Sequence, residues 1–155
     1  MQLIPLSLSG AYKILLDPHI DIRGHFVRMF CAQLFAQHNL VTNFVQVSTS
    51  LNNKKGQVRG MHYQMFPFQE TKLIRCIKGS VLDVIVDIRE NSPTYGKWHA
   101  EILSYTNMHM LYVPKGFAHG YKTLEDNSEL LYFIDEFYEP TSSRELEPLD
   151  TYWNV

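Results

Sequence analysis

Apolar and polar residues alternate along much of the chain with the period of two that is typical of half-buried β-strands. In residues 81–89 the odd and even positions fall on opposite faces, so Asp83 and Asp87 share one face. Turn-forming residues separate further strand-like runs at Thr71 to Ile77, His99 to Leu103, Met110 to Val113 and Glu129 to Phe137. Short strands at such regular spacing predict a β-sandwich or barrel.

One short helix is predicted at Cys31 to His38, where Phe30, Leu34 and Phe35 recur at helical spacing and Asn39 follows. The chain shows no internal repeat, no low-complexity tract and no linker-like change of composition. Its 155 residues also fit the usual size of one domain. We therefore expect residues 1–155 to form a single domain.

Charge and cysteine content narrow the classes of partner. Fourteen Lys and Arg against sixteen Asp and Glu give a formal charge of -2, which favours neither nucleic acid nor an anionic membrane as a partner. Cys31 and Cys76 lack paired spacing, so neither a disulfide framework nor a zinc site is expected. No cationic start precedes the first apolar residues, and no apolar run reaches the roughly 18 residues of a spanning helix. We expect a cytoplasmic protein.

Five side chains stand out as candidates for chemistry. Arg59 and His62 flank a glycine in the segment 58–64, and a second histidine, His119, lies in 114–120. Lys72 and Tyr132 occur inside strand-like runs, where an ammonium or a phenol is unusual. A single histidine in a β protein is more often structural than functional. Several such groups converging in one barrel would instead form a site.

The sequence around these residues can be compared with the signatures of metal sites and of catalytic nucleophiles. Small β-barrels often bind a metal through a His-x-His pair, but Gln64 occupies the second position here, and an amide oxygen is a poor transition-metal ligand. We expect no metal. No Gly-x-Ser-x-Gly or reactive-cysteine signature is present. Proton transfer by side chains remains.

Several motifs, taken in order and at their separations, resemble dTDP-4-dehydrorhamnose 3,5-epimerases. They are Arg23-Gly24-x-Phe26, Phe44-Val45-Gln46, Arg59 to Gln64, Lys72-Leu73, Asp83 to Arg89, Ser92 to Gly96, Pro114 to Gly120 and Glu129-x-x-Tyr132. The resemblance runs from about Asp21 to Tyr138. It implies an all-β, cupin-like double-stranded β-helix jelly roll with one short helix, a homodimer, and activity without metal or organic cofactor.

The resemblance also implies roles for the reactive residues. His62 would be the base that removes the proton next to the C4 ketone of the sugar, and its ordinary pKa near 6.5 suits that task. Tyr132 would return a proton from the opposite ring face, because return from the same face restores the starting configuration. Lys72 would hold the enolate oxygen, a contact of about 3 kcal/mol by analogy with other oxyanion donors.

The remaining implied positions bind the substrate. Arg23 and Arg59 would hold the diphosphate through their planar guanidinium groups, and His119 would add a hydrogen bond near the enolate. Gln46 and Tyr138 would contact the nucleoside. Phe26 and Ser48 complete the predicted substrate-binding set.

The sequence also departs from the family. Longer members supply, beyond the equivalent of Tyr138, an aspartate that orients the catalytic histidine, and neither Asp150 nor the segment Glu145 to Trp153 matches its surroundings. We consider Asp83 as a substitute for that aspartate. Arg28, Ser48 and Ser143 differ from common family residues. The resemblance implies dTDP as the nucleotide, and these differences leave another nucleotide as the alternative.

Three functions remain in competition. The first is a nucleotide-sugar epimerase that inverts C3, C5 or both in a 4-keto-6-deoxyhexose nucleotide, as in the dTDP-rhamnose pathway of polysaccharide biosynthesis. The second is a 3,4-ketoisomerase that uses the same enolate. The third is a non-catalytic subunit that binds sugar nucleotides. The enzyme functions are favoured because His62, Lys72 and Tyr132 are all present.

Overall fold

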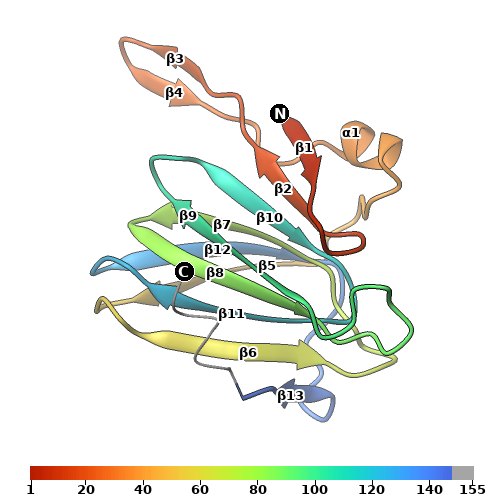
Figure 1. The fold of residues 1–155 in the computed structure, drawn as a ribbon. Helices are drawn as coiled ribbons and strands as arrows, with labels where there is room; N and C mark the ends of the chain where they lie inside the picture. The colour runs from red at the N-terminus through yellow and green to blue at the C-terminus, as the bar shows by residue number, and fades with distance from the viewer. Residues whose placement is uncertain (148–155) are drawn as a thin grey trace.

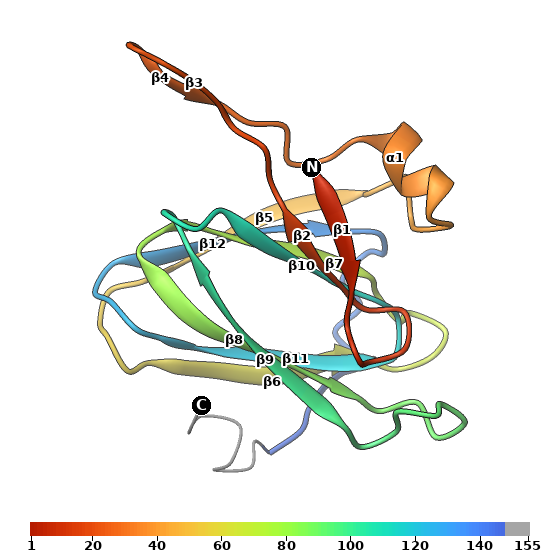
Figure 2. The same ribbon diagram turned by 45° about the horizontal axis from the view of Figure 1, so that its top comes forward.

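The computed structural model describes residues 1–147, which form an almost entirely β-stranded structure of two main sheets (Figures 1 and 2). Asp150 and Trp153 lie outside the described residues. The larger sheet has the order β1 (Gln2–Pro5), β2 (Tyr12–Leu15), β10 (His109–Val113), β7 (Lys72–Lys78), β12 (Ser128–Ile134) and β5 (Gln46–Asn52). The smaller sheet has the order β13 (Ser143–Glu145), β6 (Val58–Gln64), β11 (Phe117–Thr123), β8 (Ser80–Asp87) and β9 (Trp98–Ser104).

All strand pairs in these sheets are antiparallel, and strands distant in the sequence are neighbours, as β10 and β7 are. The two sheets face each other across a core that includes Ile74, Ile85, Leu111 and Leu130, none of which is exposed. The predicted jelly-roll fold class is confirmed. No helix within residues 1–147 has the length and apolar character that crossing a membrane requires.

Strand β8 corrects one detail of the sequence analysis. Its alternation predicted a half-buried strand, but all eight residues are buried, including Asp83 and Asp87. The reason is its place inside the smaller sheet, where β11 and β9 flank it and a second apolar cluster covers its other face. Leu82, Val84 and Val86 belong to that second cluster.

The predicted helix is present as α1 (Ala32–Gln37), within the expected range of Cys31 to His38. Its Phe35 is fully buried in a cluster with Leu73 and Tyr112, so the helix packs on the outer face of the larger sheet. A separate hairpin, β3 (His19–Asp21) and β4 (Gly24–Phe26), extends away from both sheets (Figures 1 and 2).

Candidate active site

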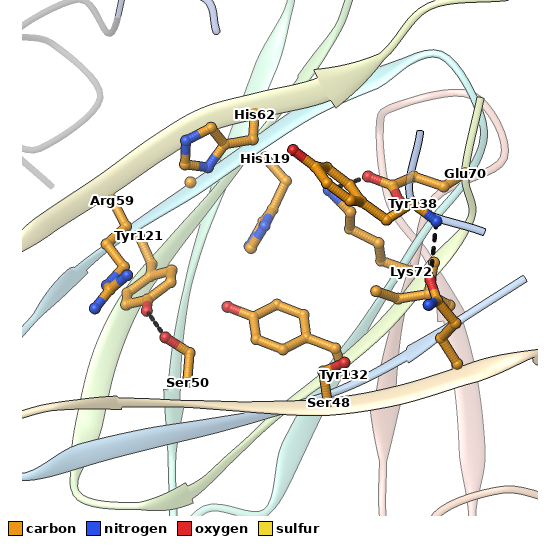
Figure 3. Close-up of a pocket in the computed structure, with 13 residues that line it drawn as sticks. Ser48, Ser50, Arg59, His62, Glu70, Lys72, His119, Tyr121, Tyr132 and Tyr138 are labelled. Carbon is orange, nitrogen blue, oxygen red and sulfur yellow. Dashed lines mark hydrogen bonds and ion pairs between the residues drawn. The ribbon is translucent and has the colours of Figure 1, made fainter. Parts of the chain in front are cut away.

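A cavity of about 370 Å³ lies between the two sheets. Strands β6 and β11 contribute to one wall and β5, β7 and β12 to the other (Figure 3). The structure brings the three predicted reactive residues, His62, Lys72 and Tyr132, into this cavity. It also brings there five of the predicted substrate-binding residues, which are Gln46, Ser48, Arg59, His119 and Tyr138.

Two glycines allow β6 and β11 to approach closely beside the site. Gly60 has φ +96°, and a Cβ added there would lie 2.5 Å from the backbone oxygen of His119. A Cβ on Gly120 would lie 2.7 Å from the backbone oxygen of Arg59. In the register of these two strands, His62 and His119 are directly opposite each other.

His62 is a half-exposed imidazole at the cavity wall. Burial lowers its pKa below the ordinary value, and the positive charges of Lys72, His119 and Arg59 lower it further. Glu145 opposes this shift: it faces His62 across β13 and β6, with Oε1 3.9 Å from Nε2. The ring is therefore predominantly neutral at pH 7, as a proton acceptor must be.

Asp83 hydrogen-bonds to His119 and not to His62. Its carboxylate oxygens lie 3.0 and 2.9 Å from Nε2 of His119, and both side chains are buried. The expected contact between Asp83 and His62 is therefore absent, because β11 lies between β6 and β8 in the sheet. Burial raises the pKa of Asp83, while the charge and hydrogen bond of His119 lower it.

Tyr132 crosses the cavity from the larger sheet, and its ring meets that of His119 edge-on at 6.0 Å between centroids (Figure 3). Burial raises the pKa of Tyr132 well above its ordinary value, and the neighbouring Tyr121 and Asp83 raise it further. The phenol therefore keeps its proton at neutral pH. A buried, protonated phenol can donate a proton or a hydrogen bond to a bound substrate.

Lys72 is buried in the cavity and its Nζ lies 2.8 Å from Oε1 of Glu70 (Figure 3). Glu70 was not predicted, because it lies in the loop before β7, where the alternation of a strand does not apply. Ser50 and Tyr121, hydrogen-bonded at 2.9 Å, also line the cavity and were not predicted. Ordinary polar and aromatic residues of this kind carry no distinguishing sequence signal.

The side chain of Gln64 forms hydrogen bonds to the backbone of two loops. Its buried amide donates to the backbone oxygens of Phe68 at 2.9 Å and Phe137 at 3.1 Å, and accepts from the backbone nitrogen of Glu139 at 2.7 Å. Gln64 therefore ties together two loops beside the cavity. Within residues 1–147 no group of three or more His, Cys, Asp or Glu side chains has metal-binding geometry.

Arg23 and Phe26 are the predicted substrate-binding residues that lie outside the cavity of their own chain. Both are on the β3 and β4 hairpin, and the guanidinium of Arg23 forms an exposed ion pair with Asp21 at 2.6 Å. A substrate in the cavity of one chain could not contact them in this arrangement.

At the rim of the cavity, the backbone nitrogen of Tyr138 donates to Oε1 of Gln46 at 3.0 Å, which places these two residues together.

Comparison with known proteins identifies the family to which this chain belongs. Residues 5–155 match the sequence profile of the dTDP-4-dehydrorhamnose 3,5-epimerase family. The chain belongs to this family. A curated epimerase of that name from Shigella flexneri is 40% identical over 134 residues, covering 84% of this chain and 74% of the relative.

Solved structures of family members agree with the fold. The crystal structure of dTDP-4-dehydrorhamnose 3,5-epimerase from Bacillus anthracis with TDP and PPi bound has a TM-score of 0.93 and 33% identity, covering 99% of this chain and 88% of that one. The 3,5-epimerase from Legionella pneumophila in complex with dTDP-4-keto-L-rhamnose has a TM-score of 0.91 and 34% identity, covering 99% and 81%. The cupin-like jelly roll predicted from the sequence is therefore confirmed.

Proposed function

We propose that this protein is a nucleotide-sugar epimerase that inverts C3 and C5 of a dTDP-linked 4-keto-6-deoxyhexose. One observation carries the proposal: His62 and Tyr132 project from opposite sheets into one cavity that also contains the ammonium of Lys72. A neutral base and a protonated acid on opposite walls are what inversion at a carbon requires. Membership of the 3,5-epimerase family supports action at both carbons.

In the proposed reaction, His62 takes the proton from the carbon next to the ketone. The electron pair of the broken C–H bond forms a C=C bond, and the carbonyl electrons move to oxygen to give an enolate. Lys72 donates a hydrogen bond to this oxygen, where preorganised donors contribute most. Tyr132 then protonates the carbon from the other face and the ketone returns. Proton transfer to and from water restores neutral His62 and the phenol of Tyr132.

The nucleotide would occupy the open side of the cavity. Arg59 donates from Nε to Oδ1 of Asn52 at 2.7 Å, which leaves its terminal nitrogens for a diphosphate. Gln46 and Tyr138 stand together at the rim, where an aromatic ring can stack on a base. The TDP bound to the relative from Bacillus anthracis supports a thymidine nucleotide.

We further propose a homodimer in which the β3 and β4 hairpin of each chain reaches its partner. Isolated two-stranded hairpins are marginally stable in water. This one exposes 74% of Ile20, 105% of Ile22 and 72% of Phe26. Contact with a partner chain would cover these side chains. It would also place Arg23 and Phe26 of one chain beside the substrate of the other chain. The single-domain organisation of residues 1–155, the cytoplasmic location and activity without a cofactor remain part of the same proposal.

Product analysis tests this function. The protein is incubated with dTDP-, GDP- and CDP-linked 4-keto-6-deoxyhexoses, and the products are identified by carbon NMR. We expect inversion at C3 and C5 with the dTDP sugar. A carbonyl moved to C3 would identify a ketoisomerase, and nucleotide binding without turnover would identify a binding subunit.

A further inference from the structure

Glu70 forms a nearly buried ion pair inside the cavity. Its Oε1 lies 2.8 Å from Nζ of Lys72, and the side chains of Lys72 and Glu70 are only 10% and 12% exposed. Both side chains line the cavity that contains His62 and Tyr132. Figure 3 shows the Lys72 side chain extending along the cavity wall toward the Glu70 carboxylate.

The Glu70 carboxylate is itself held in place. Its second oxygen, Oε2, accepts a longer hydrogen bond of 3.4 Å from Nε2 of Gln64, which also donates to the backbone oxygens of Phe68 and Phe137. The next residue, Thr71, donates its backbone nitrogen to Asp135 at 2.6 Å and accepts from the backbone nitrogen of Asp135 at 3.2 Å. Glu70 therefore stands on a segment fixed from both sides, and it can fix the position of the Lys72 ammonium.

We propose that Glu70 is a positioning residue that holds the Lys72 ammonium where the enolate oxygen forms. This inference rests on the proposed epimerase function and adds a residue to it. A lysine has a flexible four-carbon chain and three N–H donors. One donor is used by Glu70, and two remain for substrate. Without Glu70, the ammonium would be free to take other rotamers and would leave the enolate oxygen unsupported for part of the time.

Glu70 also has an opposing effect, because its negative charge reduces the attraction between Lys72 and an enolate. Enzymes gain most from donors that are already oriented, since orientation need not then be achieved during the reaction. A misplacement of about 1 Å can reduce a rate by about a hundredfold. We therefore expect the loss of positioning to exceed the gain in charge.

A double-mutant cycle tests the inference. Deuterium incorporation at C3 and C5 of the dTDP-linked ketosugar is measured for wild type, Glu70→Gln, Lys72→Met and the double variant. In the wild-type background, Glu70→Gln should lower kcat about ten- to hundredfold with little change in KM, because the nucleotide contacts lie elsewhere. In the Lys72→Met background, the same change should have less than about a twofold effect, since it acts through Lys72.

Two further variants complete the experiment. Glu70→Asp keeps the negative charge and should retain more activity than Glu70→Gln. Glu101→Gln is the matched control: Glu101 pairs with Lys13 at 2.9 Å with side chains 16% and 23% exposed, and it lies outside the cavity. It should leave exchange unchanged.

The outcomes separate cleanly. Faster or unchanged exchange in Glu70→Gln, an equal loss in both backgrounds, or Glu70→Asp no more active than Glu70→Gln would each overturn the positioning role alone. Wild-type protein that exchanges no deuterium with any ketosugar nucleotide would overturn the proposed function, and with it this inference.

Discussion

The imidazole of His119 and the carboxylate of Asp83 form a buried hydrogen-bonded pair, with Nε2 2.9 Å from Oδ2. His119 lines the cavity, whereas Asp83 lies behind it on β8. Asp83 therefore fixes the orientation of a ring that faces the substrate and meets Tyr132. In the proposed reaction His119, oriented by Asp83, donates a hydrogen bond near the enolate, and neither residue removes the proton from the sugar carbon.

Asp83→Asn should lower kcat for deuterium exchange by about ten- to hundredfold, because loss of a partner that orients a site residue has effects of this size. Breaking a buried pair should also lower the free energy of unfolding by about 3 kcal/mol. Urea unfolding and exchange rates on the same samples measure both effects. An Asn variant with unchanged exchange would show that the orientation of His119 is unimportant to the reaction.

The pH dependence of activity should report His62. Burial lowers the pKa of His62 below 6.5, so the base stays neutral at pH 7 and becomes protonated only in more acidic solution. We expect kcat/KM to fall as the pH drops through a midpoint below 6.5. A pH profile of kcat/KM from about pH 4.5 to about pH 8, on both sides of the ordinary histidine value, measures this midpoint. A midpoint well above that value would contradict the assignment.

Glu145 provides a finer test of the same group. Its carboxylate raises the pKa of His62, so Glu145→Gln should move the acid midpoint to lower pH. Both side chains are more than half exposed, so the shift should become smaller in high salt. Glu147→Gln makes the same charge change two residues away and is the control. A shift of equal size in Glu147→Gln would show that Glu145 has no specific effect on the pKa of His62.

Asp87 should make the fold sensitive to acid. Its buried carboxylate accepts from Arg89 at 2.7 Å, Ser92 at 2.5 Å and Thr94 at 2.6 Å. Burial raises its pKa, but these hydrogen bonds outweigh that effect and leave the pKa well below its usual range. The stabilisation is therefore complete above the unfolded value near 3.9 and is lost as the pH falls through the lower folded value.

Asp87→Asn should accordingly lose about 3 kcal/mol of unfolding free energy at pH 7. The difference from wild type should shrink as the solution is acidified below about pH 4. Urea unfolding at pH 7 and at acid pH measures the two differences. An equal difference at both pH values would show that the ionised carboxylate is not the source of the stability.

The hairpin should hold two chains together. Replacing Ile22 and Phe26 by Ser removes exposed apolar surface that the proposed partner would cover. We expect the variant to be monomeric by light scattering, to remain folded, and to bind dTDP more weakly because Arg23 would no longer be delivered. A wild-type protein that is monomeric at high concentration would contradict the proposed dimer.

Much of the fold and part of the site could be predicted from the sequence. The alternation in residues 81–89 located β8, and the family motifs placed Lys72, His119 and Tyr132 in one cavity. Alternation could not show that both faces of β8 are covered, since that depends on its neighbours β11 and β9. The strand order that separates Asp83 from His62 is likewise a property of the assembled sheet.

Contacts between nearby residues were also missed. The pairing of Glu70 with Lys72 depends on how the loop before β7 is held by Gln64 and Asp135, which no local pattern reveals. The place of Arg23 and Phe26 on a projecting hairpin could not be read from their motif, because a motif gives residue types and not the path of the chain.

Proton exchange and inversion, measured together, test the central claim most directly. The dTDP-linked ketosugar is incubated in deuterated buffer with wild type, His62→Asn and Tyr132→Phe, and proton NMR follows label and configuration at C3 and C5. We expect wild type to exchange and invert, and His62→Asn to lose both by about a thousandfold. Tyr132→Phe should exchange label while losing most of the inversion. Inversion that survives in His62→Asn, or wild type without exchange, would contradict the account.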